Sequence, residues 1–127
     1  MTQNLESLTS AVVGLALDAA SLRHQAIANN IANVNTQGYI PLKLNFASYM
    51  EQMEQISTTS GNLEGQKISG GKLELEQVFD SQGQPAKVEL DAEVAAMAHN
   101  TVHYQTLIKA LNRHYAILSS AVSDGKK

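Results

Sequence analysis

Apolar residues at both ends of the chain recur in alternating steps of three and four residues. Such spacing puts the side chains on one stripe of an α-helix and is typical of helices that supercoil around each other. The N-terminal seam consists of Leu5, Leu8, Val12, Leu15, Ala19, Leu22 and Ala26. The C-terminal seam consists of Val94, Met97, Thr101, Tyr104, Ile108, Leu111, Tyr115, Leu118 and Val122. We therefore predict a mainly α fold whose long N- and C-terminal helices, over about residues 9–33 and 91–123, form an antiparallel coiled coil.

A second apolar stripe runs along the N-terminal helix beside the first. Its members are Val13, Leu17, Ala20, His24, Ile27, Ile31 and Val34. An antiparallel hairpin of the two terminal helices would account for one stripe, whereas two adjacent stripes indicate contacts with more than one neighbouring helix. At 1.5 Å per residue the predicted helices are roughly 40 and 50 Å long. Rods of this kind would gain stability from copies of the same chain.

The middle of the chain is short and polar. Gly38 suits a turn after a helix, and a short helix is predicted from about Asn45 to Ile56. A linker rich in Ser, Thr and Gly follows over residues 57–72. Alternating residues from Lys72 to Phe79 predict a strand, with Lys87–Leu90 as the second arm of a β-hairpin. We divide the chain into paired terminal helices, residues 1–38 and 88–127, and a central loop and hairpin region, residues 39–87.

Composition argues against several classes of function. The net charge is −3, and the nine Lys and Arg residues are scattered, which makes nucleic-acid binding a poor fit. Cysteine is absent, so disulfides and thiolate chemistry are excluded. The first ten residues lack the basic and apolar regions of a cleavable secretory signal. No uninterrupted apolar run approaches the roughly 18 residues of a membrane span, so we do not expect a membrane-spanning protein.

No motif indicates catalysis. His99 and His103 are four residues apart and would share one helix face, but the sequence places no third metal ligand near them. The segment from Ser69 to Lys72 has only a fragment of a phosphate-binding loop. We therefore expect no enzyme activity, no catalytic or metal site and no cofactor.

Asparagines replace apolar residues where the N-terminal seam ends. Asn29 and Asn33 continue the seam, Asn30 projects to another side, and Asn35 precedes the turn at Gly38. Asparagine is a good residue for ending helices and forming turns, which explains the later positions. For Asn29 and Asn30 we predict interhelical hydrogen bonds that fix how copies stack.

The segment LDAASLRHQAIANNIANVNTQGY, Leu17 to Tyr39, closely resembles the N-terminal signature of the flagellar rod, hook and hook-associated axial proteins. Members of that family usually have proline in the place of Gln37, so this turn is less rigid. The segment from Val88 to Val122 resembles the C-terminal end of the same family. The short middle of the chain makes it most similar to the small proteins of the proximal rod.

The resemblance implies a structural subunit of the bacterial flagellar basal-body rod. Such subunits assemble into a hollow, periplasmic drive shaft that transmits torque and passes exported subunits. They are exported without a cleaved signal peptide by the flagellar type III system. The implied partners are copies of itself, the rod proteins FlgC, FlgF and FlgG, the adaptor FliE, the MS ring and the flagellar export gate. The alternatives are placement as the related small rod protein FlgC, or a soluble helical-hairpin adaptor or chaperone.

The resemblance and the seams together select sixteen residues as assembly contacts. Those of the N-terminal half are Leu15, Leu22, Ile27, Asn29, Asn30, Ile31, Asn33, Asn35, Gly38 and Tyr39. Those of the C-terminal half are Met97, Asn100, Tyr104, Ile108, Leu111 and Leu118.

Overall fold

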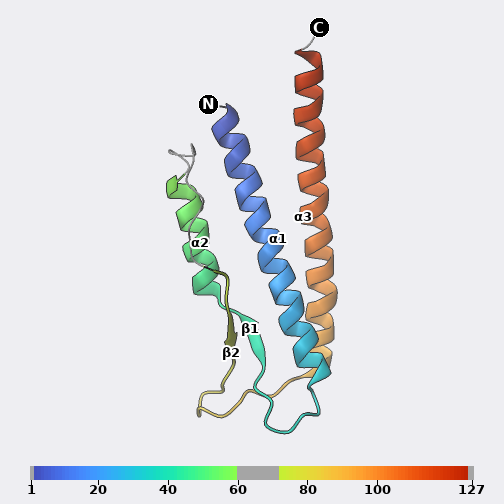
Figure 1. The fold of residues 1–127 in the computed structure, drawn as a ribbon. Helices are drawn as coiled ribbons and strands as arrows, with labels where there is room; N and C mark the ends of the chain where they lie inside the picture. Colours follow the sequence, from blue (N-terminus) through green and yellow to red (C-terminus); the bar gives the residue numbers. More distant parts are fainter. Residues whose placement is uncertain (1, 60–71, 126–127) are drawn as a thin grey trace.

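The computed structural model describes residues 2–59 and 72–125, with side chains from residue 5 onwards (Figure 1). In chain order the elements are α1 (Thr2–Ala32), β1 (Leu42–Leu44), α2 (Phe46–Thr59), β2 (Leu75–Gln77) and α3 (Leu90–Asp124). The two long helices run antiparallel, and α1 lies between α2 and α3 (Figure 1). The predicted fold class is therefore confirmed, because seams at both chain ends form long helices that pair with each other.

We call the end of this helix pair at which α1 ends and α3 begins the turn end, and the opposite end the open end. Helix α3 starts with Asp91 and Glu93 in its first turn, where carboxylates interact favourably with the positive end of the helix dipole. Helix α2 starts after Asn45, whose side-chain oxygen accepts a hydrogen bond from the Ser48 N–H at 3.1 Å. This is the bond of an N-cap residue, and it fixes where α2 leaves the strand before it.

The predicted hairpin between residues 72–79 and 87–90 is wrong. Strand β2 instead pairs antiparallel with β1, with Leu42 opposite Gln77 and Leu44 opposite Leu75. An ion pair of 3.3 Å between Lys43 and Glu76 joins the two strands. The second arm does not form because α3 already begins at Leu90.

A tight turn follows β2 in place of that hairpin. The Asp80 carboxylate accepts hydrogen bonds from the N–H groups of Gln82 and Gln84, each at 2.9 Å. Gly83 has φ of 76°, a conformation that residues with a Cβ adopt at a cost. An isolated bridge between Phe79 and Pro85 closes the turn, together with backbone hydrogen bonds from the Asp80 N–H to the Gln84 carbonyl and from the Ala86 N–H to the Val78 carbonyl.

The linker predicted for residues 57–72 begins later than expected, because α2 continues to Thr59. Most of that linker lies outside the described residues, as does the start of the Ser69–Lys72 segment.

The buried part of the described molecule is small. It includes the apolar residues Ala19, Ala20, Ala26, Ile27, Leu44 and Ile56, and the polar residues Asn30, Gln52 and Asn100. In the helix pair, every buried residue lies at the turn end, within residues 19–32 of α1 and 90–100 of α3. None of residues 5–18 of α1 or 101–124 of α3 is buried.

Helix α1 is unusually apolar for its exposure. The stretch Leu5–Ala32 is long enough to cross a membrane, and its most apolar 18-residue window has a mean hydropathy of 1.3. Only 11% of that window is buried within the described chain. The count of uninterrupted apolar residues did not detect this, because polar residues are spaced along the helix. Length and composition do not distinguish a membrane span from a helix that packs against other helices. In either case, α1 presents apolar surface that the described chain leaves uncovered.

Candidate functional site

Asn30 is the centre of a hydrogen-bond network at the turn end. Its side chain is 2% exposed. The amide nitrogen donates to the Leu42 carbonyl at 2.9 Å, and the amide oxygen accepts from the Leu42 N–H at 2.9 Å and from the Tyr39 hydroxyl at 2.7 Å. The side chain thus pairs with both backbone groups of one residue of β1, and thereby holds the strand against α1.

The hydrogen bonds that the structure shows for Asn30 lie within the chain, and a contact of Asn30 with a second copy stays a prediction. The residue is buried, and its oxygen is fully used within the chain. Asn29 is exposed, and for Asn29 the contact with a second copy stays a prediction.

The chain after α1 turns through local hydrogen bonds. The Asn33 side chain donates to the Asn29 carbonyl at 2.9 Å and accepts from the Thr36 hydroxyl at 3.1 Å. Gly38 has φ of 79°, which supports its predicted role as a turn residue. Asn35 is exposed. Asn33 therefore ends the helix, consistent with the helix-termination interpretation of this segment.

Tyr39 is placed by the same turn. Burial and, to a lesser degree, the negative charge of Glu93 raise the pKa of the Tyr39 hydroxyl. A raised pKa keeps the hydroxyl protonated, as its hydrogen bond to Asn30 requires.

A second buried amide, Asn100, joins α3 to α1. Its nitrogen donates to the Ala20 carbonyl at 2.8 Å, and the side chain is 2% exposed. Ala20 and Ala26 are buried at 1% exposure, and their small side chains allow the helices to approach closely. The Asn100 oxygen is also buried but has no hydrogen-bond partner within the described part of the chain.

Asn100 lies beside a groove of about 750 Å³ between the two long helices. The groove is lined by Ala20, Ser21, His24, Gln25, Asn100, Thr101, Tyr104, Gln105, Ile108 and Lys109. It begins at the turn end and continues along α3 towards the open end. Sequence reasoning did not predict it, because a groove depends on how two distant helices diverge.

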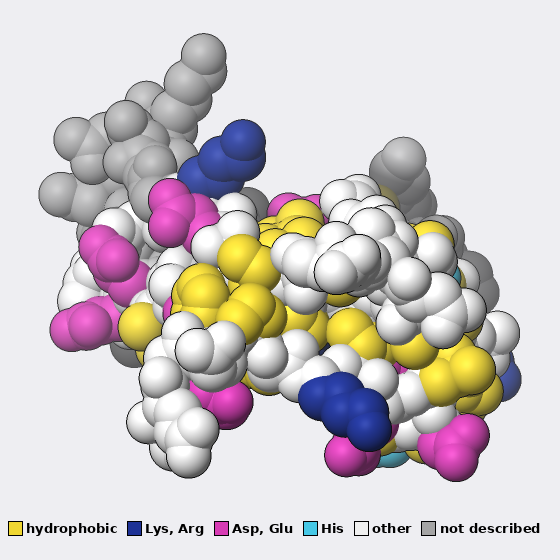
Figure 2. All heavy atoms as spheres, turned by 90° about the horizontal axis from the view of Figure 1, so that it is seen from below, with side chains coloured by type: hydrophobic (Ala, Val, Ile, Leu, Met, Phe, Trp, Pro, Cys, Tyr) yellow, Lys and Arg dark blue, Asp and Glu magenta, His cyan; other side chains and the backbone are white. Residues whose placement is uncertain are grey.

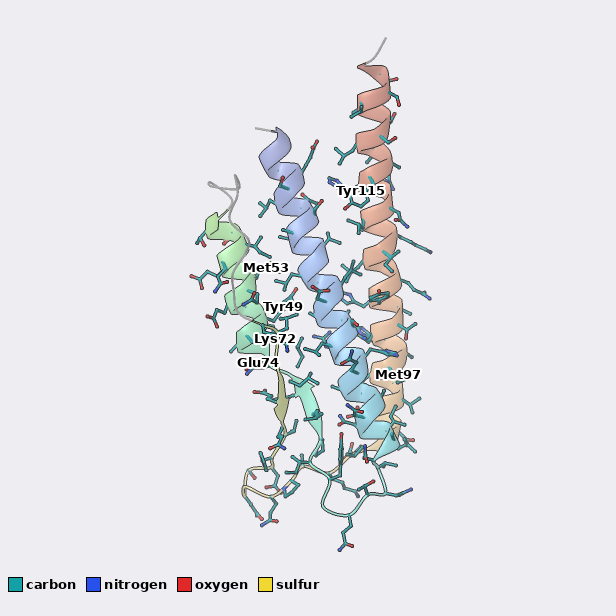
Figure 3. All side chains as sticks on the ribbon, in the orientation of Figure 1. Tyr49, Met53, Lys72, Glu74, Met97 and Tyr115 are labelled. Atoms are coloured by element: carbon teal, nitrogen blue, oxygen red, sulfur yellow. The ribbon has the colours of Figure 1, made fainter. Side chains whose placement is uncertain are left out.

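The structure distributes the sixteen predicted contact residues over three degrees of burial. Ile27, Asn30 and Asn100 are buried. Leu15, Leu22, Ile31, Asn33, Tyr39, Met97, Ile108, Leu111 and Leu118 are half-buried. Asn29, Asn35, Gly38 and Tyr104 are exposed. Figure 3 shows Met97 in the lower part of α3 and Tyr115, another seam residue, in its upper part.

Large apolar side chains remain exposed along both helices. They include Leu5 on α1 and, on α3, Val94, Val102, Tyr115, Ile117 and Val122. Apolar side chains also reach the surface across the turn end, where acidic side chains flank them (Figure 2). His99 and His103 are both exposed, and no group of three or more potential metal ligands occurs among the residues that the structure describes.

A pair of long antiparallel helices with amide contacts at one end and incompletely covered apolar seams at the other is typical of a subunit that packs against further helices. Residues 14–39, which contain the asparagine network, match the family model of the flagella basal body rod proteins. The chain is 27% identical to the flagellar basal body rod protein FlgB of Bacillus subtilis (strain 168), over 98% of this chain and 94% of that protein.

The family match and the similarity to FlgB together support a flagellar basal body rod protein, a structural subunit of the rod. Its place is therefore the flagellar basal body, where it assembles with other rod components. Similarity to this family of structural proteins implies a structural and non-enzymatic role.

Proposed function

We propose that the chain forms the proximal part of the rod, with α1 and α3 as its inner layer. Residues 1–38 and 88–127 would build a coiled-coil domain that lines a hollow tube, and residues 39–87 would contact neighbouring subunits. The similarity to FlgB over nearly the whole chain supports proximal placement over the FlgC-like alternative. The tube would transmit torque and pass later export substrates.

One observation supports this assignment most strongly: residues 5–17 of α1 are half-buried or exposed in the single chain, and none of them is buried. Burial of apolar surface contributes about 25 cal/mol per Å². A helix left this open gains much of its stability only when other helices cover it. The exposed and half-buried seam residues would supply those contacts.

The proposed partners follow from this placement. Besides copies of itself, the chain would contact FlgC, FlgF and FlgG along the rod, and the adaptor FliE, the MS ring and the export gate at its base. Export would proceed through the flagellar type III system in the periplasmic direction, without a cleaved signal peptide. Absence of cysteine suits export as an unfolded chain, because no disulfide has to form or be broken on the way.

Two measurements test the proposal. Deleting the chain in its natural host should abolish swimming, and purified basal bodies from the complemented strain should contain the chain. In strains that lack the later rod proteins, the chain should still co-purify with the MS ring. Its absence from those preparations would exclude proximal placement.

Limited proteolysis of the purified monomer tests the coupling of folding to assembly. We expect early cuts within residues 5–18 and 105–122, and later cuts around the buried residues of the turn end. Protection of all these segments would indicate a self-sufficient hairpin, as in a soluble adaptor or chaperone.

A further inference from the structure

The groove between α1 and α3 contains a buried hydrogen-bond acceptor without a donor. The Asn100 oxygen has no partner within the described residues, although the residue is 2% exposed. A buried acceptor that is left unpaired carries the cost of its lost hydration. A donor supplied from outside the chain would remove this cost.

The groove is lined by apolar and uncharged polar side chains and by one lysine. Ala20, Tyr104 and Ile108 are among its lining residues, and so is Lys109. None of the ten lining residues is acidic. Lys109 forms no ion pair within the part of the chain that the structure describes.

The outer face of α2 has the complementary character. Phe46 and Met50 are one helical turn apart and are 67% and 47% exposed. Glu51 and Glu54 are also exposed and form no ion pair among the described residues. Helix α2 contains no Lys or Arg. An apolar pair flanked by carboxylates is thus turned away from the rest of its own chain.

We propose that this groove receives the outer face of α2 from a second copy of the chain. The proposal rests on the assignment as a rod subunit and specifies one contact between copies. Phe46 and Met50 would enter the groove, and Glu54 would lie against Lys109. In the first turn of α2 the N–H groups of Ser48 and Tyr49 bond to Asn45, so the N–H groups of Phe46 and Ala47 would be the ones to approach the Asn100 oxygen.

The distance between the interacting groups is similar along the two helices. At 1.5 Å per residue, Phe46 and Glu54 are about 12 Å apart along α2, and Asn100 and Lys109 are about 14 Å apart along α3. The match requires α2 of one copy to run parallel to α3 of the next.

Within one chain, α2 and α3 already run in the same direction, each starting near the turn end (Figure 1). Copies that share one polarity along a tube therefore present α2 to the groove in the required direction. A contact between two different surfaces continues from copy to copy and builds a helical filament when it does not close into a ring.

Engineered cysteines test the contact, because the chain has none of its own. Met50→Cys on α2 and Gln105→Cys in the groove should form a disulfide between copies in assembled basal bodies, seen as a dimer and, because the contact repeats, as higher oligomers in a non-reducing gel. A disulfide requires Cα atoms about 4.4–6.8 Å apart. Both positions are exposed, so circular dichroism of the purified variants should match the unmodified chain.

The matched control pairs Met50→Cys with His103→Cys. His103 is exposed on α3 but does not line the groove, so this pair should give no dimer. A third pair, Leu5→Cys with Gln105→Cys, tests α1 of a neighbouring copy as the occupant.

A dimer from the Met50–Gln105 pair alone would support the proposal. A dimer from the Leu5–Gln105 pair alone, or none from any pair in basal bodies that contain the chain, would overturn it and leave the rod assignment intact. Absence of the chain from basal bodies would overturn the rod assignment, and this contact with it.

Discussion

The two ends of the α1–α3 pair differ in how completely they are folded within one chain. At the turn end, buried alanines and two buried amides join α1 to α3 and to β1. At the open end, the same helical periodicity continues, yet none of residues 5–18 of α1 or 101–124 of α3 is buried. A regular seam therefore specifies a helix and its apolar face, but it does not specify whether the partner belongs to the same chain.

The largest effect is expected from Asn30→Ala. The change leaves both backbone groups of Leu42 without their side-chain partner at a buried site, and it removes the acceptor of the Tyr39 hydroxyl. We expect the free energy of unfolding of the purified chain to fall by about 2–4 kcal/mol, as measured by urea titration.

Asn29→Ala is the matched control for Asn30→Ala, because Asn29 is the exposed neighbour on the same helix. It should alter stability by less than about 0.5 kcal/mol. Equal effects of the two changes would show that the network contributes nothing particular to the turn end.

Ala20→Leu should have the next largest effect. Ala20 is 1% exposed, and its carbonyl accepts the Asn100 hydrogen bond. A larger side chain at this position would push α3 away from α1 and cost about 1–3 kcal/mol in the urea titration. Ala28→Leu, at an exposed position of the same helix, should be almost neutral. If Ala20→Leu were tolerated equally well, the turn end would be packed less closely than described.

At the open end, the comparison predicts the opposite behaviour. Ile117→Ser changes a residue that is exposed on α3, so the monomer should lose no more than about 0.5 kcal/mol. Swimming of the complemented strain should nevertheless fail, because the missing apolar contact belongs to the assembly. Normal swimming would mean that this part of α3 is not covered by other subunits.

The smallest effect is expected from the ionisation of Tyr39. Its pKa is raised in the folded chain, so its contribution to stability is fully present at neutral pH. That contribution is lost as the pH rises past the ordinary tyrosine pKa of about 10, because the unfolded state then releases the proton first. Urea titrations at increasing pH should show a steeper alkaline loss for the unmodified chain than for Tyr39→Phe. If the stability of the two proteins fell equally with rising pH, the ionisation of Tyr39 would not be coupled to folding.

Features that depend on residues close together in the sequence were predicted, whereas features that depend on residues far apart in the sequence were not. The long helices were predicted because the steps from Leu5 to Ala26 and from Val94 to Val122 are local and repeat many times. The partner of β2 was not predicted, because Leu42–Leu44 is too short to show an alternating pattern. Residues 87–90 looked equally suitable, although they lead directly into α3.

The candidate site shows the same limit. The position of Asn30 within an amide-rich turn was evident, but its partner is the backbone of Leu42, and a backbone group has no sequence signal. Ala20 and Ala26 did give a signal, since small residues on a seam indicate close helix approach. Asn100 was selected through its position in a family segment. Its contact with Ala20 depends on the pairing of α3 with α1, which brings together residues 80 positions apart in the sequence.

The short sheet has a consequence for how this chain can be altered. The backbone bond of 2.8 Å from the Asn45 N–H to the Glu74 carbonyl continues the β1–β2 pairing at the point where the chain departs into α2 and later returns. The residue at which the chain leaves the sheet, Asn45, and the residue at which it returns, Glu74, are therefore held next to each other. A segment or domain of almost any length can be inserted between these two residues without displacing α1 and α3, provided that its own N- and C-termini lie close together. The same position would accept a fluorescent domain or an epitope tag, and it is where a longer relative could acquire an outer domain.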